Sequence, residues 1–104
     1  MDTAELIEII SRDEDSKHQF KGNIYNADQI AAEMVAFCNS GGGRIFVGVN
    51  NDGSLSGLTR EDIGRINQLI SNAASNNMNP PINPITENIT LNKGIVMVIT
   101  ILDG

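Results

Sequence analysis

Residues 30–49 place the tightest constraint on the fold of this chain. Apolar side chains first recur at helical spacing, at Ile30, Met34, Phe37 and Cys38. Gly41 then ends the pattern, because glycine readily takes the left-handed conformation that terminates helices. The run Ile45-Phe46-Val47 follows, and consecutive apolar residues are typical of a strand covered on both faces. The segment therefore predicts a helix that turns tightly into a central strand.

Two further helices are indicated, and two of the three helices have recognisable starts. Residues 5–10 read as a short N-terminal helix. Asn26 is a good N-cap for the helix that contains Ile30, and Gln29 completes a pattern like a capping box. Thr59 caps the next helix, with Asp62 at the third position of its box. Glu33, on the polar side of the middle helix, is expected to be solvated.

The remaining segments read as strands and turns. Asp52-Gly53 is a dipeptide preferred in tight hairpin turns, so residues 54–57 are expected to return as a partner strand. An Asn-rich stretch ends at Pro80-Pro81, which forbids further helix. Other strands are expected at residues 18–21, 85–91 and 95–102. The order α, β, α, β, β, α, β, β predicts an α+β fold, a mixed β-sheet with two main helices and a short N-terminal helix.

Length and composition describe one domain, residues 1–104. Hydrophobic residues make up 40% of the chain, enough for a single packed core. No apolar run approaches the roughly 20 residues of a membrane helix, and the acidic N-terminus lacks the layout of a signal peptide. The single cysteine, Cys38, forms no internal disulfide. We therefore expect a cytoplasmic protein without a membrane partner.

The charge of the chain is unevenly distributed. Seven basic and thirteen acidic residues give a net charge of −6. Residues 1–15 hold six of the acids and one base, so the remainder carries six bases and seven acids, a balance of −1. Phosphate contacts need Lys and Arg, and no dense basic cluster is visible. The near-neutral remainder leaves room for a local basic patch but not for strong nonspecific binding to nucleic acid.

Three stretches together resemble the Schlafen Alba-type domain of transcriptional regulators, some of them once labelled as divergent ATP-dependent helicases. They are EDSKHQFK at residues 14–21, AFCNSGGGRIFVGVNNDGSLSGL at residues 36–58, and Pro80-Pro81-Ile82 with the later IVMVITIL. The resemblance covers residues 5–102. It implies an Alba/Schlafen-like fold and a nucleic-acid-binding module, with DNA the first expectation. The chain stops after a strand that looks interior, which indicates the N-terminal fragment of a longer protein.

Catalysis is not expected. The eukaryotic relatives that cleave RNA carry three carboxylates for a metal, and the matching positions here are Glu14, Gln19 and Asn50. Two of these are neutral amides, which do not supply the negative charge that holds Mg²⁺ or Mn²⁺. Asp15 or Asp52 remains as an off-position substitute. We therefore expect no catalytic residue, no metal and no cofactor, and a metal-dependent nuclease is the least favoured alternative.

The glycine run at residues 41–43 is expected to be a tight helix-to-strand turn. A phosphate loop precedes a helix, whose N-terminus then faces the anion. Here the run follows a helix, so the dipole of that helix points the wrong way, and no Gly-Lys-Ser/Thr is present. We expect no ATP hydrolysis. Backbone N–H groups beside Arg44 remain a weaker candidate for a phosphate contact.

A polar face is expected near the matched motifs. If Gln19 and Lys21 share a strand face and Arg44 begins a neighbouring strand, these residues could form one surface. The candidate nucleic-acid-binding residues are Lys17, Gln19, Lys21, Asn39, Arg44 and Asn50. For each residue alone, ordinary solvated surface charge is the competing interpretation. The whole chain also fits a protein-interaction or regulatory domain without nucleic-acid contact, which the net charge favours.

Two further partners follow from these expectations. One is the C-terminal remainder of the longer protein, which would supply the affinity or specificity that a weak module lacks. The other is a second copy. If the sheet edge of residues 95–102 is open, that strand could pair with another chain to form a homodimer.

Overall fold

The structure is a computed structural model that describes residues 1–76 and 82–103. Within these residues, three helices and four strands follow one another along the chain. They are α1 (Thr3–Ser11), β1 (His18–Lys21), α2 (Ala27–Asn39), β2 (Gly43–Val47), α3 (Arg60–Asn76), β3 (Ile85–Leu91) and β4 (Gly94–Ile101). This confirms the α+β class with a mixed sheet, two main helices and a short N-terminal helix. The Pro80-Pro81 pair lies outside the described residues.

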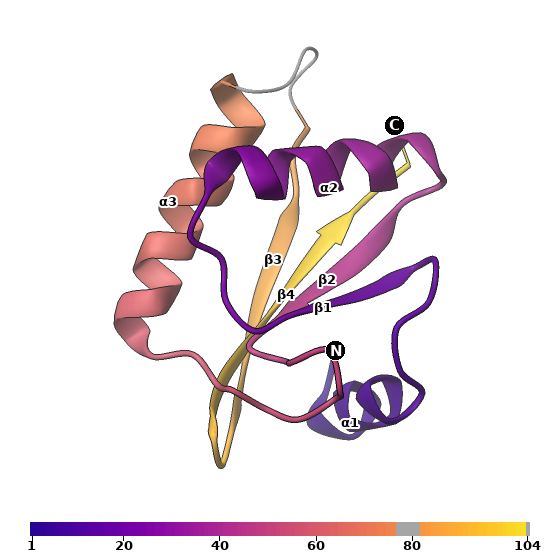
Figure 1. The fold of residues 1–104 in the computed structure, drawn as a ribbon, viewed down its shortest axis with the longest axis vertical. Coiled ribbons are helices and arrows are strands. Elements are labelled where there is room, and N and C mark those ends of the chain that lie inside the picture. The colour runs from indigo at the N-terminus through magenta and orange to yellow at the C-terminus, as the bar shows by residue number, and fades with distance from the viewer. Residues whose placement is uncertain (77–81, 104) are drawn as a thin grey trace.

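The four strands form one sheet in the order β1-β2-β4-β3 (Figure 1). β1 and β2 are parallel and are joined through α2, while β4 runs antiparallel to both β2 and β3. β4 is therefore an interior strand, as its β-branched sequence suggests. The hypothesis that residues 95–102 offer an open edge is wrong, because β2 and β3 occupy both sides of β4. The edges of the sheet are β1 and β3.

Each face of the sheet has its own apolar core. One core combines α2 and α3 with inward residues of β2 and β4, among them Ile45 and Val47. The other combines α1 with residues that include Phe20 and Phe46. Phe46, the residue between Ile45 and Val47, is fully buried like its neighbours. Alternate residues of β2 thus enter different cores, which confirms the expected strand covered on both faces.

Local signals set the starts of α2 and α3. The Asn26 side chain accepts hydrogen bonds from the N–H groups of the first turn of α2. At α3, the Thr59 N–H donates to Asp62 Oδ2 at 2.9 Å and the Asp62 N–H donates to Thr59 Oγ1 at 3.1 Å. This is a complete capping box, as the spacing predicts. α3 continues through the start of the Asn-rich stretch to Asn76.

The expected partner strand at residues 54–57 does not form. The backbone bends at Gly48, which has a φ of 102°, and its N–H and that of Val49 both donate to the Lys21 carbonyl. Only one isolated bridge, between Val49 and Leu55, remains of the predicted pairing. The turn itself is present, with Gly53 donating to the Asn50 carbonyl at 2.9 Å. The bend takes the chain away from the sheet before a ladder can extend.

Candidate functional site

The predicted polar face divides between the two faces of the sheet. In the parallel register, His18 lies opposite Arg44 and Gln19 lies opposite Ile45. Since side chains alternate along a strand, Arg44 shares its face with His18 on the α1 side, while Gln19 and Lys21 lie on the α2 side. The expectation of one surface containing both Lys21 and Arg44 is therefore wrong.

Lys21 is engaged on its own face. Its Nζ lies 2.5 Å from Glu33 Oε1, and the two side chains are only 26% and 18% exposed. The expectation that Glu33 is solvated is wrong, because α2 packs across β1 and brings this carboxylate over the strand. The other Glu33 oxygen, Oε2, is buried without a hydrogen-bond partner in the structure. Lys21 thus balances a half-buried carboxylate and offers little charge to a ligand.

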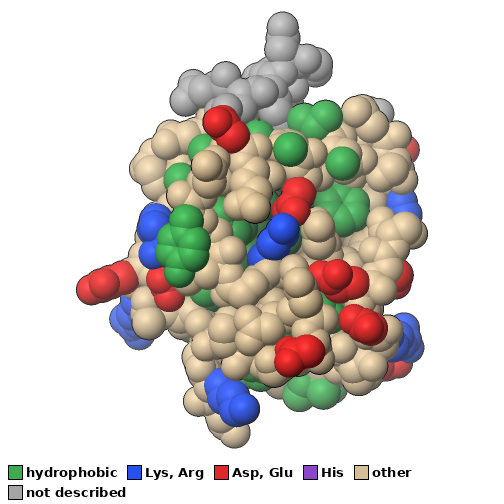
Figure 2. Space-filling model, in the orientation of Figure 1, with side chains coloured by type: hydrophobic (Ala, Val, Ile, Leu, Met, Phe, Trp, Pro, Cys, Tyr) green, Lys and Arg blue, Asp and Glu red, His purple; other side chains and the backbone are tan. Residues whose placement is uncertain are grey.

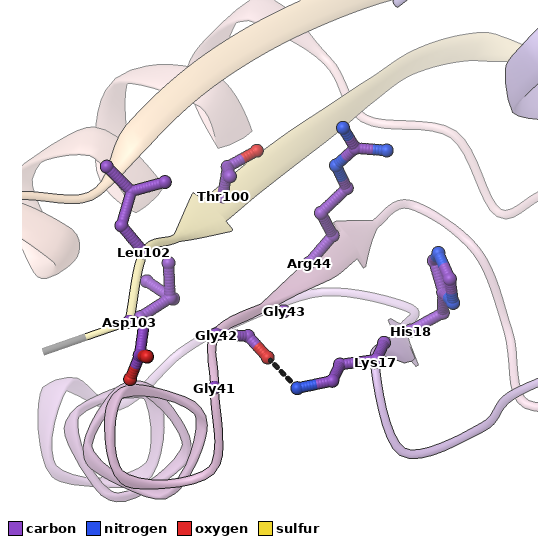
Figure 3. Close-up of a pocket in the computed structure, with 10 residues that line it drawn as sticks. Lys17, His18, Gly41, Gly42, Gly43, Arg44, Thr100, Leu102 and Asp103 are labelled. Atoms are coloured by element: carbon purple, nitrogen blue, oxygen red, sulfur yellow. Dashed lines mark hydrogen bonds between the residues drawn. The ribbon is translucent and has the colours of Figure 1, made fainter.

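Lys17 and Arg44 both line a shallow hollow of about 260 Å³ where β1 and β2 begin and β4 ends, with their charged groups pointing in different directions (Figure 3). The Arg44 N–H donates to the Lys17 carbonyl at 2.8 Å, which ties the two segments together. The lining combines one histidine, two cations, the glycine turn and the end of β4. Its members are Lys17, His18, Gly41, Gly42, Gly43, Arg44, Thr100, Ile101, Leu102 and Asp103.

The Lys17 side chain stabilises the glycine turn that forms one wall of this hollow. Its Nζ donates to the Ser40 carbonyl at 2.7 Å and to the Gly42 carbonyl at 3.2 Å, the second bond being drawn in Figure 3. Carbonyls at the C-terminal end of α2 carry partial negative charge, so the ammonium group is well placed there. An ammonium has three N–H donors, and these two bonds leave one for a ligand.

Arg44 is the more available cation of the hollow. Its side chain is 39% exposed, and its nearest carboxylate, Glu5 of α1, lies 4.0 Å away at the limit of an ion pair. Figure 3 shows the guanidinium pointing away from the glycine turn. His18 lies beside it in the sheet register, stacked on Phe46 with 6.0 Å between ring centroids. A planar guanidinium of this kind suits bidentate contact with a phosphate.

Asp15 shapes the histidine end of the hollow. Its Oδ1 accepts a hydrogen bond from the Lys17 N–H at 2.7 Å and lies 2.8 Å from His18 Nδ1. The Lys17 N–H, followed by His18, lowers the pKa of the Asp15 carboxyl below 3.8. The Asp15 carboxylate is therefore committed to organising this loop.

The glycine run is a tight turn, as predicted. Gly41 and Gly42 have φ values of 93° and 85°. A Cβ on Gly42 would lie 2.6 Å from the Ile101 carbonyl oxygen, and one on Gly43 would overlap the Phe37 ring. The Gly42 N–H donates to the Phe37 carbonyl at 2.7 Å. With the N–H groups of Gly42 and Arg44 both engaged within the fold, side chains are left as the main donors to an anion here.

The three positions that match the family's carboxylates have other partners in this chain. Glu14 Oε1 accepts from the Phe20 N–H at 2.7 Å, at the outer edge of β1. Asn50 donates from Nδ2 to Ser54 Oγ at 3.0 Å, within its turn. Gln19 lies on the α2 face, and Asn39 lies exposed in the last turn of α2. Within residues 1–76 and 82–103, no three His, Cys, Asp or Glu side chains group as metal ligands.

Arg65 is a structural cation for which the sequence holds a single weak signal. Its guanidinium donates to Asn23 Oδ1 at 2.6 Å, pairs with Asp62 at 2.9 Å, and lies 4.7 Å from the centroid of the Tyr25 ring. These contacts tie the segment before α2 to α3. Tyr25 is 73% exposed, so one face of this cluster is open. The i, i+3 spacing of Asp62 and Arg65 is the one visible signal for it.

On the face that Figure 2 shows, the described Lys and Arg side chains are not gathered into one patch. Figure 2 shows Lys and Arg side chains scattered among Asp and Glu side chains on the face in view. With a net charge of −6, the whole chain repels polyanions at long range. Among the described helices, none is long and apolar enough to cross a membrane. Attraction to an anion must therefore be local, as in the hollow of Lys17 and Arg44.

Comparison with known proteins adds the family. A search against curated proteins gave no significant match. The family model described as Schlafen, AlbA_2 matches residues 14–104, from the loop before β1 to the end of the chain. The matched residues contain both walls of the hollow and strands β1 to β4, and α1 lies before them. The chain therefore belongs to the Schlafen AlbA_2 family.

Proposed function

We propose that this domain is a nucleic-acid-binding module of a transcriptional regulator and that it contacts DNA through Lys17 and Arg44. Membership of the Schlafen AlbA_2 family supports a nucleic-acid-related function. The single observation that supports this site most strongly is that the Arg44 side chain is accessible to a ligand. Its ion-pair partner, the Glu5 carboxylate, lies 4.0 Å away. Lys17, with one free N–H, and the neighbouring His18 extend the same contact surface.

The proposed contact is weak by itself. Two cations reach few phosphates, and each phosphate contact contributes to both affinity and salt dependence. The acidic remainder of the chain opposes approach of a polyanion. A second module, in the same protein or in another copy, would convert such weak contacts into useful avidity. The domain would then position nucleic acid more than it selects a sequence.

Binding to labelled duplex DNA, single-stranded DNA and structured RNA at two salt concentrations tests the proposal. We expect duplex binding that weakens with salt, and Arg44→Ala should lower both the affinity and the salt slope, the slope by about 1. Lys93→Ala is the matched control, because it removes one exposed positive charge at the far end of β4, in the hairpin. Equal losses in the two variants would show that only net charge matters and would reject the site.

We propose a binding role rather than a catalytic one. Gln19 and Asn50 replace carboxylates of the nuclease relatives, and Glu14 is bonded to the backbone of β1. Incubation of the chain with labelled RNA and Mn²⁺ is the test. Cleavage that disappears in Glu14→Gln would overturn the binding-only role, whereas intact RNA in both samples is the expected result.

A protein-interaction role without nucleic acid is the second candidate. The acidic segment of residues 1–15 favours it, since α1 presents carboxylates that suit a basic protein partner. Absence of binding to all three nucleic acids at low salt would select this candidate. Under either function we propose a cytoplasmic location, where the single Cys38 would stay reduced.

A further inference from the structure

The two edges of the sheet differ in whether other backbone segments cover them. Along β1, the loop before the strand folds back over the outer edge, with a bridge between Asp15 and His18 and the Glu14 carboxylate on the Phe20 N–H. Along β3, no described residue pairs with the outer edge. Exposed edges are usually shortened, charged or covered to prevent pairing with other chains. β3 instead has seven residues, no proline and one charged side chain, Glu87.

The hairpin register identifies the free backbone groups of β3. Leu91 pairs with Gly94 across a two-residue turn, and such a closing pair exchanges both hydrogen bonds. Because bonded pairs alternate along an antiparallel ladder, residues 85, 87, 89 and 91 direct their N–H and C=O groups toward β4. Thr86, Asn88 and Thr90 direct theirs outward. The outer edge therefore offers three evenly spaced donor and acceptor pairs.

The sequence of β3 is nearly the same when read in either direction. In Ile-Thr-Glu-Asn-Ile-Thr-Leu, Asn88 is central, threonines flank it at equal distance, and both ends are aliphatic. A strand of this kind complements a second copy of itself in antiparallel register. Thr86 of one copy then faces Thr90 of the other, and Ile85 faces Leu91. Ile85 is 55% exposed in the single chain and would gain an apolar neighbour.

We propose that β3 pairs with β3 of a second copy, antiparallel and centred on Asn88, to make one continuous eight-stranded sheet. No like charges lie directly opposite each other across this interface, and the only like-charged diagonal neighbours along the strand are the two copies of Glu87. Glu87 would lie opposite Ile89 of the second copy, and its carboxylate is already bound by the Met1 ammonium at 3.0 Å. The outward N–H and C=O groups of the three polar residues would be satisfied by their symmetry equivalents.

Long-range charge gives the pairing a characteristic salt dependence. Each copy carries −6, so two copies repel, and added salt screens this repulsion. Self-association is therefore expected to strengthen with salt, whereas phosphate binding weakens with it. The opposite signs separate this interface from the nucleic-acid site.

A charge-swap experiment tests the interface and its register. Sedimentation analysis of the whole chain should show association from 11.2 kDa to twice that mass. Thr86→Lys/Thr90→Lys and Thr86→Glu/Thr90→Glu each place like charges opposite each other, so each should lower the association constant by about tenfold or more. An equimolar mixture should restore the dimer through opposite charges. Asn67→Lys/Gln68→Lys, on exposed positions of α3, controls for net charge and should leave the dimer intact.

Hydrogen exchange provides a readout that is specific to the edge. The amides of Thr86, Asn88 and Thr90 should become protected as concentration rises, while the amides of residues 85, 87 and 89 are protected throughout. A chain that stays monomeric at its highest soluble concentration would overturn the proposal. So would a dimer that persists in both charged variants, or one that forms without protection of the three outward amides.

Discussion

The two faces of the sheet treat a basic residue in opposite ways. On the α2 face, Glu33 lies 2.5 Å from Lys21 and the pair is largely withdrawn from solvent. On the α1 face, Glu5 lies 4.0 Å from Arg44, and the guanidinium remains open beside a hollow. The two cations are three residues apart in register across neighbouring strands. The helix that covers each face, more than the basic residue itself, decides whether its charge supports the fold or is available to a ligand.

The largest expected effect concerns the turn that brings Arg44 to its position. Gly42→Ala would place a Cβ 2.6 Å from the Ile101 carbonyl oxygen at a φ of 85°. We expect a loss of about 3 kcal/mol of unfolding free energy, measured by urea denaturation. Gly64→Ala is the control, since an added Cβ would meet nothing within 4 Å beyond the backbone of its own helix, and it should stabilise α3 by about 0.5–1 kcal/mol. Equal unfolding midpoints for the two variants would contradict the steric account.

The second prediction tests the contrast between the faces directly. Lys21→Met keeps the alkyl chain but leaves the Glu33 charge half-buried and unpaired, which should cost about 2 kcal/mol, below the value for a fully buried pair. Arg44→Met should cost less than about 0.5 kcal/mol, because its ion pair is exposed and long. Thermal and urea unfolding measure both. The contrast fails if the two variants are equally stable.

Asp62 is a third carboxylate with a cationic partner, after Glu33 and Glu5. Its contribution to stability is expected to lie between theirs and to depend on pH. Hydrogen bonds, first from the Thr59 N–H and then from Arg65, lower the pKa of Asp62 from 3.8 to about 2. Since the folded pKa lies below the unfolded one, Asp62 stabilises the fold above pH 3.8, and this contribution is lost as pH falls toward 2. Removing the cap by Thr59→Ala should cost about 1 kcal/mol at neutral pH.

The matching pH experiment uses Asp62→Asn. Its destabilisation relative to the unmodified chain should be full at neutral pH and should shrink through the acid range. Glu61→Gln removes the same charge from the same helical turn and serves as the control. A deficit of Asp62→Asn that stays constant down to pH 2 would disagree with the lowered pKa.

The smallest expected effect is the influence of Glu5 on phosphate binding by Arg44. Glu5→Gln removes the distant carboxylate, so phosphate affinity should rise by about twofold, with little change in stability. The measurement is DNA binding at low salt, where exposed charges are least screened. Glu61→Gln, on the other side of the sheet, removes the same net charge. An equal rise in both variants would mean that Glu5 acts only through the total charge.

Local sequence signals predicted most of the fold. The caps at Asn26 and Thr59, the glycine turn and the apolar run of β2 depend on neighbouring residues, so their chemistry is visible in the chain. The strand expected at residues 54–57 does not form, because the backbone bends just before it at a residue that is bonded to a distant part of the sequence. Gly48 takes a φ of 102°, and the Val49 N–H shares the Lys21 carbonyl with the Gly48 N–H, so the chain leaves the ladder after β2 through a partner that only the sheet supplies.

The site was less predictable because it depends on register. Lys17 and Arg44 meet through a parallel pairing that α2 sets up, and the same pairing separates Lys21 from Arg44. The position of Glu33 over β1 depends on how α2 crosses the sheet. Neither the face of a side chain nor the carboxylate that will oppose it can be read from spacing along one strand.

The position of α1 has a consequence for how the chain folds. Leu6 and Ile9 belong to the same core as Val96 and Val98, about ninety residues later. During synthesis the first helix therefore emerges long before the strand that buries it, and its apolar side must wait for nearly the whole domain. The sheet is also completed late. β4 lies between β2 and β3, so these two strands become part of one sheet only after β4 has been synthesised. α1 thus leaves the ribosome well before β4, which completes the core around it.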